Sequence, residues 1–222
     1  VKTDSISLDK NSFKILDYVK DGGVEFSTLS PFAVLSENID TALWKKLIAC
    51  IDDAKIAQYD GVIILHGSDT LSFTSALIGN AYPNEKIVLI AADKPLEDKK
   101  SNGVKNFKTA VELIKNKKIS HPMTVYDGVF DALAITGADV EDKFRSVLPT
   151  PTPHGKKIIS DKSILIVKVY PGFDANNYNF ANTDGVIFTM YHSATVPNGV
   201  KDALKMLDNQ KIPYRFVTHR QS

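Results

Sequence analysis

The sequence predicts an α/β protein, with a larger N-terminal domain whose mostly parallel sheet is flanked by helices and a smaller parallel C-terminal domain. Short β-branched runs alternate with segments of helical periodicity along the whole chain, as in α/β folds. Runs such as 62–65 are apolar throughout, which is typical of parallel strands buried on both faces. The prolines in 150–153 interrupt the alternation. We therefore expect an N-terminal domain over 1–150, a linker over 151–161 and an incomplete C-terminal domain over 162–222.

The N-terminal domain begins, after a polar first segment, with a strand expected over 32–35. The polar turn 36–38 follows, and a helix starts near Asp40 or Thr41. Its inward face has helical spacing and consists of Trp44, Leu47, Ile48 and Ile51. The later elements are a strand at 62–65, a helix at 70–78 capped by Thr70, a strand at 86–90, a helix capped by Ser101, and strands at 123–126 and 130–136 joined by a turn.

The C-terminal domain has the same alternation on a smaller scale. Strands are expected over 164–169, 186–190 and 216–218, and all of them are expected to be parallel. A helix over 199–207 connects the last two strands. No repeat or low-complexity tract occurs in the chain.

Composition excludes several classes of function. The chain has 222 residues, of which 43% are hydrophobic and 24% charged, with a formal net charge of +1 and no basic block, so it gives no support for nucleic-acid binding. No apolar run reaches membrane-spanning length, and the cytoplasm is the expected location. The single cysteine, Cys50, lies on an apolar helix face, which indicates a small buried hydrophobe rather than a nucleophile. Metal-ligand spacings and glycine-rich phosphate loops are absent from the sequence, so no metal or cofactor is expected.

Three polar turns follow neighbouring apolar strands, at 36–38, 67–69 and 91–93. Because the carboxyl ends of parallel strands meet at one edge of a sheet, these turns are expected to line one pocket. A hydroxyl beside a carboxylate, such as Ser68 beside Asp69, suits nucleophilic attack on a carbonyl group and also suits binding of a small polar ligand. Three solvated loops, with the 67–70 turn a simple helix cap, remain the alternative.

The histidines receive different interpretations. His66, inside the turn after its strand, is expected to be a packed, hydrogen-bonded structural residue rather than a base. His121 and His154 lie beside prolines in loops and are expected to be solvated. His192 ends a strand and is a weaker candidate for facing a site.

The stretch 60–70, DGVIILHGSDT, resembles the signature D-G-[VI]-V-[IV]-x-H-G-T-D-T of bacterial-type L-asparaginases. Further matches follow in the same order along nearly the whole chain. They are FAVLSEN at 32–38 with Trp44, IVLI at 87–90, the segment 95–107, VYPGF at 169–173 and YHS at 191–193. The chain is more similar to the cytoplasmic, type I branch than to the secreted one.

This resemblance implies an amidohydrolase that uses a threonine nucleophile, forms an acyl-enzyme and releases ammonia from L-asparagine, with L-glutamine as the alternative substrate. Ser68 takes the place of the second of the family's two catalytic threonines. Asp69 matches the aspartate that holds the substrate's α-amino group and orders the proton relay.

The resemblance also implies a set of substrate-binding residues. Ser36 and Glu37 fall where the family holds the substrate carboxylate and amino group, Gly67 lies beside the second threonine, and Ala92 falls at a backbone contact to the substrate amide. Active sites in this family form between subunits, so a homodimer or homotetramer is expected.

The sequence departs from the family pattern in three places. The family's N-terminal T-G-G-T-I, which carries the first threonine, does not occur, and Val1 lies about where that motif should have just ended. The lysine expected after the second hairpin strand is absent from 135–139, and Lys143 is out of register. The chain stops at Ser222, before the expected last elements of the smaller domain. We expect either a fragment or a degenerate member stabilised by partner chains.

Two alternatives to an asparaginase follow from these departures. One is a catalytically inactive amino-acid-binding or regulatory protein on the same scaffold. The other is the amidase subunit that feeds ammonia to a tRNA-dependent amidotransferase, which the absence of a basic region disfavours.

Overall fold

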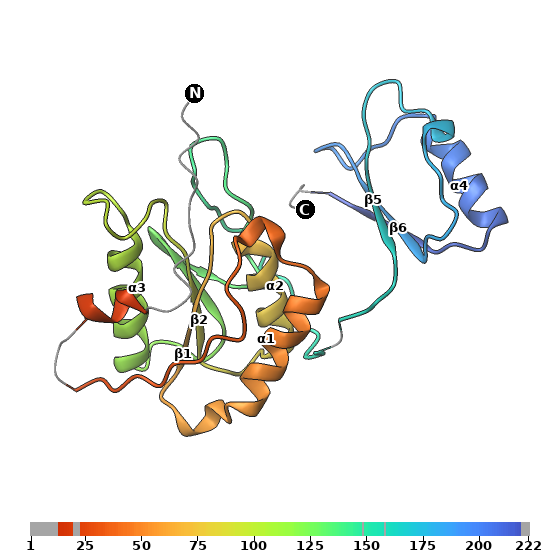
Figure 1. Cartoon of the computed structure of the whole chain (residues 1–222). Helices are drawn as coiled ribbons and strands as arrows, with labels where there is room; N and C mark the ends of the chain where they lie inside the picture. The colour runs from red at the N-terminus through yellow and green to blue at the C-terminus, as the bar shows by residue number, and fades with distance from the viewer. Residues whose placement is uncertain (1–12, 20–22, 148, 158, 219–222) are drawn as a thin grey trace. The chain divides into compact units, whose positions relative to one another are not determined.

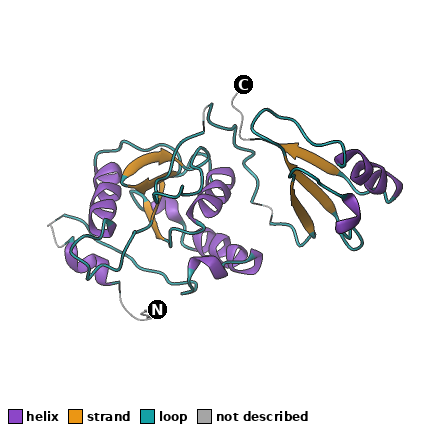
Figure 2. Cartoon of the chain, turned by 90° about the horizontal axis from the view of Figure 1, so that it is seen from above, coloured by secondary structure: helices purple, strands orange, loops and turns teal. Residues whose placement is uncertain are grey.

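The computed structural model describes residues 13–19, 23–147, 149–157 and 159–218 (Figures 1 and 2). The chain divides into two compact units, residues 1–159 and 160–222, and each unit is described by itself. Each combines strands and helices, which confirms the predicted α/β class. Among the described residues, no helix is long and apolar enough to cross a membrane.

The first unit is built on a four-stranded sheet in the order β1-β2-β3-β4. Strands β1 (Val62–Leu65), β2 (Ile87–Ile90) and β3 (Met123–Tyr126) are parallel, whereas β4 (Gly128–Asp131) is antiparallel to β3. Because Leu65 pairs with Ile90, strands β1 and β2 end level with each other. Their following turns therefore start side by side.

Helices cover both faces of this sheet (Figure 1). Helices α1 (Thr41–Asp53) and α2 (Leu71–Ala81) lie on one face, and α3 (Gly103–Lys115) lies on the other with the short 3₁₀ helix η1 (Lys14–Tyr18). The side chains of β2 alternate between the two layers, since Ile87 and Leu89 pack with α1 and α2 whereas Val88 and Ile90 pack with α3. All of β2 is buried, as its continuous apolar sequence predicts.

The two crossovers of this sheet have opposite hands. The chain passes from β1 through α2 to β2 and then through α3 to β3, moving in the same direction across the sheet both times. Since α2 and α3 lie on opposite faces, one crossover is right-handed and the other is left-handed. Left-handed parallel crossovers are rare, about one in fifty.

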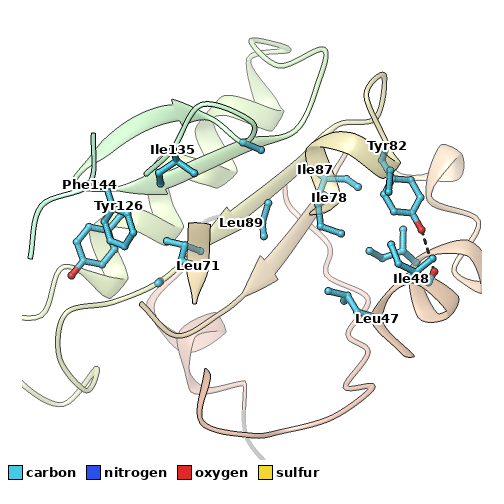
Figure 3. Packing of buried hydrophobic residues seen from close by; sticks show 14 residues of the cluster. Leu47, Ile48, Leu71, Ile78, Tyr82, Ile87, Leu89, Tyr126, Ile135 and Phe144 are labelled. Atoms are coloured by element: carbon cyan, nitrogen blue, oxygen red, sulfur yellow. Dashed lines mark hydrogen bonds between the residues drawn. The ribbon is translucent and has the colours of Figure 1, made fainter. Parts of the chain in front are cut away.

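The larger core of the first unit lies between the sheet and the α1–α2 layer (Figure 3). Leu71 and Ile78 of α2 are fully buried against the side chains of β2. Tyr82 closes one end, where its hydroxyl shares its one proton between the carbonyl oxygen of Ile48 at 3.1 Å and the carboxylate of Asp52 at 2.9 Å. This layer fixes α2, and with it the turn that precedes α2.

The second unit contains a three-stranded parallel sheet in the order β5-β6-β7. Its strands are β5 (Ile164–Lys168), β6 (Gly185–Thr189) and β7 (Tyr214–Val217). Helix α4 (Val200–Asn209) connects β6 to β7, and its Val200, Ala203 and Leu207 are buried against the sheet. The short 3₁₀ helix η4 (Ala175–Asn177) joins the same core.

Most expected elements are confirmed to within a few residues, but three expectations are wrong. Residues 32–35 form no strand, because they pair with no strand in the described part of the chain and a strand needs a ladder partner. Strand β4 ends at Asp131 rather than at residue 136, since Asp131 turns the chain by accepting from Leu133 N at 2.8 Å. β1 is half-buried rather than buried, because it stands at the edge of the described sheet.

Two smaller expectations are also refined. Helix α3 is preceded by Asn102 at its N-cap position, while the Ser101 hydroxyl accepts from Gly103 N at 3.2 Å. Cys50 is half-buried, and burial raises the pKa of its thiol, with the nearby Asp53 carboxylate adding to the rise. A raised pKa leaves little thiolate, which agrees with the interpretation of Cys50 as a packing residue.

Candidate functional site

The turns that follow β1 and β2 lie next to each other at the carboxyl edge of the sheet. The ladder continues one residue past the strands, where His66 N donates to the Ile90 carbonyl at 2.9 Å. Gly67, Ser68 and Asp69 leave the sheet from that point, beside Ala91 and Ala92. Asp69 is exposed and Ser68 is half-buried, so both side chains remain accessible.

The third turn, η2 (Ser36–Asn38), contacts the first one directly. Gly67 approaches Ser36 so closely that a Cβ at position 67 would lie 2.5 Å from the Ser36 hydroxyl oxygen. Thr70 fastens the same contact, because its hydroxyl donates to the Ser36 carbonyl at 2.8 Å. Thr70 does occupy the N-cap position of α2, but its side chain makes no capping hydrogen bond, so the expectation of a side-chain cap is wrong. The hydroxyl joins two turns instead.

The turn after β2 is held from behind by two buried asparagines of the α3 region. Asn106, only 1% exposed, donates from Nδ2 to the Ala91 carbonyl at 2.9 Å. Asn102 and Asp93 exchange hydrogen bonds, each backbone N–H donating to the other side chain at 2.9 Å. Ala92 lies between Ala91 and Asp93, which these hydrogen bonds hold in place, so the backbone of Ala92 is fixed by its neighbours.

The same asparagines connect to the β3–β4 turn. Asn102 Nδ2 donates to the Asp127 carboxylate at 2.7 Å, and Asp127 N donates to Asn106 Oδ1 at 3.0 Å. The hydrogen bond from Asn102 and the ion pair with Lys105 lower the pKa of Asp127. Asp127 therefore stays ionised at neutral pH and keeps this network charged.

His66 is a structural residue, as the sequence predicted. Its Nδ1 lies 2.7 Å from the Gly67 carbonyl oxygen and its Nε2 lies 2.8 Å from the Thr74 hydroxyl. Burial lowers the pKa of His66, although the hydrogen bond to Gly67 opposes part of that effect. Both ring nitrogens are engaged by the protein, so His66 is not arranged to take a proton from a ligand.

A groove with a volume of about 2240 Å³ runs past these turns. Its lining contains every candidate residue of the first unit, namely Ser36, Glu37, Gly67, Ser68, Asp69 and Ala92. It also contains Ile63 and Ile64 of β1 and the segment 23–35. The volume exceeds the roughly 300–1,000 Å³ of pockets that enclose small ligands, so a small polar ligand would fill only part of it.

The groove wall at the turns is negatively charged. Glu37, Asp69 and Asp93 line it together, with Lys94 the neighbouring cation. An ammonium group is the natural partner for such carboxylates, whereas a ligand without positive charge gains nothing from them. Within the part of the chain that the structure describes, no group of acidic, histidine or cysteine side chains could hold a metal ion.

Other candidates lie elsewhere. Lys143 is absent from the groove lining and forms an exposed ion pair with Glu141. Gly137, near the place of the expected lysine, carries no side chain. The expectation that His121 is solvated is incomplete, because His121 pairs with Asp131 at 3.0 Å. His192 is exposed in the second unit.

Three supporting residues were missed by reasoning from the sequence: Thr74, Asn102 and Asn106. All three are buried polar residues inside a helix or at its N-cap. In such segments the sequence is interpreted from its apolar positions, so the polar ones were not considered. Thr74 and Asn106 interrupt the buried stripes of α2 and α3, and Asn102 and Asn106 fall in the family-like segment 95–107. That pattern alone does not show which turn a side chain reaches.

Comparison with known proteins finds a family whose model matches most of the first unit's sequence. Residues 4–143 match the family model described as "Asparaginase, N-terminal". Among curated relatives, a glutamyl-tRNA(Gln) amidotransferase subunit of Methanococcus maripaludis is 27% identical over 187 residues, covering 68% of this chain and 45% of that protein. A probable periplasmic L-asparaginase of Haemophilus influenzae is 33% identical over 86 residues, covering 38% of this chain and 24% of that protein. The chain thus spans less than half the length of these relatives.

Solved structures show the same fold. The probable cytoplasmic L-asparaginase from Campylobacter jejuni superimposes with a TM-score of 0.73 at 21% identity, covering 90% of this chain and 71% of that one. The thermostable L-asparaginase from Thermococcus kodakarensis gives a TM-score of 0.73 at 18% identity, covering 92% and 70%. At these identities the similarity establishes the fold alone.

Proposed function

This chain belongs to the asparaginase family, and from that membership we propose that it acts as an L-asparaginase-type amidohydrolase, converting L-asparagine and water to L-aspartate and ammonia. The observation that carries the proposal is the meeting of three turns at one sheet edge. Gly67 touches Ser36, and the turn holding Ser68 and Asp69 lies beside that of Ala92. This groups a hydroxyl, carboxylates and backbone N–H groups along one groove.

The proposed binding mode follows from charge. The ligand's α-ammonium group is held by Asp69, with Glu37 as the second carboxylate, while the Ser36 turn receives the ligand's α-carboxylate. The side-chain amide then extends toward Ser68 and the backbone at Ala92. Gly67 carries no side chain, which lets the Ser36 turn pack directly against the turn that holds Ser68 and Asp69.

The proposed chemistry is acyl transfer through a hydroxyl nucleophile. A hydroxyl oxygen attacks the amide carbon, the C–N bond breaks and ammonia leaves with the proton that the hydroxyl loses. Water then hydrolyses the ester to aspartate and regenerates the hydroxyl. Ser68 stands at the position of the family's second threonine, and it keeps the hydroxyl while losing a methyl group. The family's lysine is absent, and Gly137 lies near its place. We therefore expect a slow reaction.

Calorimetry and an ammonia assay test this proposal. The folded protein is titrated with L-asparagine and with L-aspartate, and ammonia release is followed enzymatically. Asp69→Ala is expected to weaken binding of both ligands by about tenfold or more, because the ammonium group loses its charged partner. Asp60→Ala is the matched control, since Asp60 is an exposed carboxylate that lines the same groove but lies at the opposite, amino end of β1. Failure of the folded protein to bind either ligand would refute the proposal.

The same measurements separate two other proposals. Ligand binding without ammonia release indicates an amino-acid-binding protein on this scaffold. The similarity to glutamyl-tRNA(Gln) amidotransferase subunits favours a second candidate, an amidase that supplies ammonia to a tRNA-dependent amidotransferase. That role predicts ammonia release which rises when a partner subunit and charged glutamyl-tRNA are added.

Assembly and location are likewise proposals. A homodimer or homotetramer in the cytoplasm is expected from the family, and sedimentation velocity measures the assembly directly. L-Glutamine competes with L-asparagine for the site only if the pocket accepts one further methylene group, which the same calorimetry determines.

A further inference from the structure

A chain of hydrogen bonds stands directly behind the Gly67–Ser68 turn. Trp44 of α1 donates from Nε1 to the Thr74 hydroxyl of α2 at 3.0 Å. That hydroxyl lies 2.8 Å from His66 Nε2, and His66 Nδ1 lies 2.7 Å from the Gly67 carbonyl oxygen. Residues from two helices and one strand end therefore converge on a single peptide group.

The chemistry of the partners fixes the direction of every bond. A carbonyl oxygen only accepts, so the proton must lie on Nδ1 of His66. In a neutral imidazole Nε2 is then an acceptor, and the Thr74 hydroxyl gives it its one proton. Trp44 Nε1–H only donates, and it fills the acceptor side of the same hydroxyl. Each bond has one possible direction while the imidazole is neutral, because reversing any of them leaves two donors or two acceptors facing each other.

The chain is buried at its centre. Thr74 is 0% exposed, so no solvent water replaces a bond that it loses. In the described part of the chain, no buried side-chain nitrogen or oxygen lacks a partner. Burial also lowers the pKa of His66, which keeps the imidazole in the neutral form that this arrangement needs.

The last bond determines how the Gly67–Ser68 peptide faces. In a trans peptide the C=O and N–H groups point in opposite directions. Holding the Gly67 carbonyl against His66 therefore directs the Ser68 N–H away from that ring. On its other side Gly67 is confined by Ser36, whose hydroxyl oxygen would lie 2.5 Å from an added Cβ. His66 holds the Gly67 carbonyl, and Ser36 blocks the space on the side of Gly67 where a Cβ would stand.

We infer that Thr74 is a positioning residue, which holds His66 in its Nδ1–H tautomer and thereby sets the orientation of the Gly67–Ser68 peptide at the ligand site. The inference rests on the proposed function only in taking Ser68 and Asp69 to contact the ligand. Thr74 touches no ligand itself and acts through His66. Trp44 supports it by supplying the bond that orients the Thr74 hydroxyl.

The test uses conservative variants of Thr74. Thr74→Val keeps the shape but removes the hydroxyl, whereas Thr74→Ser keeps the hydroxyl. Thr124→Val is the matched control, because Thr124 is also 0% exposed and donates its hydroxyl to Ser75 at 2.8 Å, outside the chain of bonds. The ¹⁵N chemical shifts of the imidazole report the tautomer of His66, and the amide chemical shifts of Gly67 and Ser68 report the orientation of their peptide group. Calorimetry with L-aspartate reads the ligand site.

The wild-type protein is expected to show the Nδ1–H tautomer. Thr74→Val is expected to move the His66 Nε2 and Ser68 amide signals and to weaken L-aspartate binding by about tenfold. Thr74→Ser and Thr124→Val should leave all three readouts near wild type. An Nε2–H tautomer in the wild type, or a Thr74→Val variant that behaves like Thr124→Val, overturns the inference. If the wild type binds no L-aspartate, the proposed function fails, and the two NMR readouts still decide the role of Thr74.

Discussion

Replacing Gly67 by alanine places one methyl group in the close contact between the Gly67 and Ser36 turns. The added Cβ would lie 2.5 Å from the Ser36 hydroxyl oxygen and 2.8 Å from its Cβ, both shorter than side-chain carbons tolerate. Ser36 is only 5% exposed, and its carbonyl is held by Thr70 at 2.8 Å. Rotation of the Ser36 side chain moves its hydroxyl but not its Cβ, and that Cβ moves only with the backbone that Thr70 holds, so the two turns must separate.

The expected cost is that of overpacking, about 1–3 kcal/mol in the free energy of unfolding. In a protein of this size, each kcal/mol lowers the melting temperature by about 2–4 °C. Urea denaturation followed by circular dichroism measures the free energy, and scanning calorimetry measures the temperature. Gly137→Ala is the control, because a Cβ added at Gly137 would have its nearest neighbour, the Ser72 hydroxyl oxygen, 3.9 Å away. This substitution is expected to change the free energy of unfolding by less than about 0.5 kcal/mol.

A double-mutant cycle isolates the contact. Ser36→Gly removes both atoms that the new methyl group meets, so Gly67→Ala should cost much less in that background. If Gly67→Ala is as mild as Gly137→Ala, or equally costly with and without the Ser36 side chain, then steric contact between the turns is not what holds them together.

Two further predictions concern the residues behind the turns. Because burial lowers the pKa of His66 below its ordinary 6.5, the unfolded chain binds the proton more readily, and the free energy of unfolding should fall as pH drops below about 6.5. His66→Gln should flatten that part of the curve, and an unchanged slope in urea titrations between pH 7.5 and 5.5 contradicts the assignment. Asn106→Ala leaves the Ala91 carbonyl and Asp127 N–H without their partner and should cost about 2–4 kcal/mol in the same assay, whereas a loss under about 0.5 kcal/mol argues that water replaces both bonds.

Strands were predictable from the sequence where burial alone decides them. β2 has four consecutive apolar residues, all buried, and its limits were predicted within one residue. Residues 32–35 have the same kind of sequence but form no strand, because pairing depends on a neighbour that no local pattern specifies. The hand of a crossover is hidden in the same way. The usual right-handed rule predicts α2 and α3 on one face, and the packing of Ile87 and Val88 into different layers shows that they are not.

The candidate residues that line the groove could be predicted from the sequence, whereas the buried residues that support them could not. Ser68 and Asp69 stand out because polar residues directly after an apolar strand are conspicuous, and the family pattern marks the same positions. Thr74 and Asn106 lie inside helices, and their partners are 8 and 15 residues away in the chain. Such bonds exist only once the helices are packed against the sheet, so spacing along the sequence does not reveal them.

The unusual crossover gives the two turns separate supports. Because α2 lies on one face of the sheet, its Thr74 reaches the turn after β1 from that side. Because α3 lies on the other face, its Asn106 reaches the turn after β2 from the opposite side. Two crossovers of the same hand would place both helices on one face, and one of the two turns would lose the buried side chain behind it. The rare topology therefore lets neighbouring turns be held independently, while their open sides face one groove.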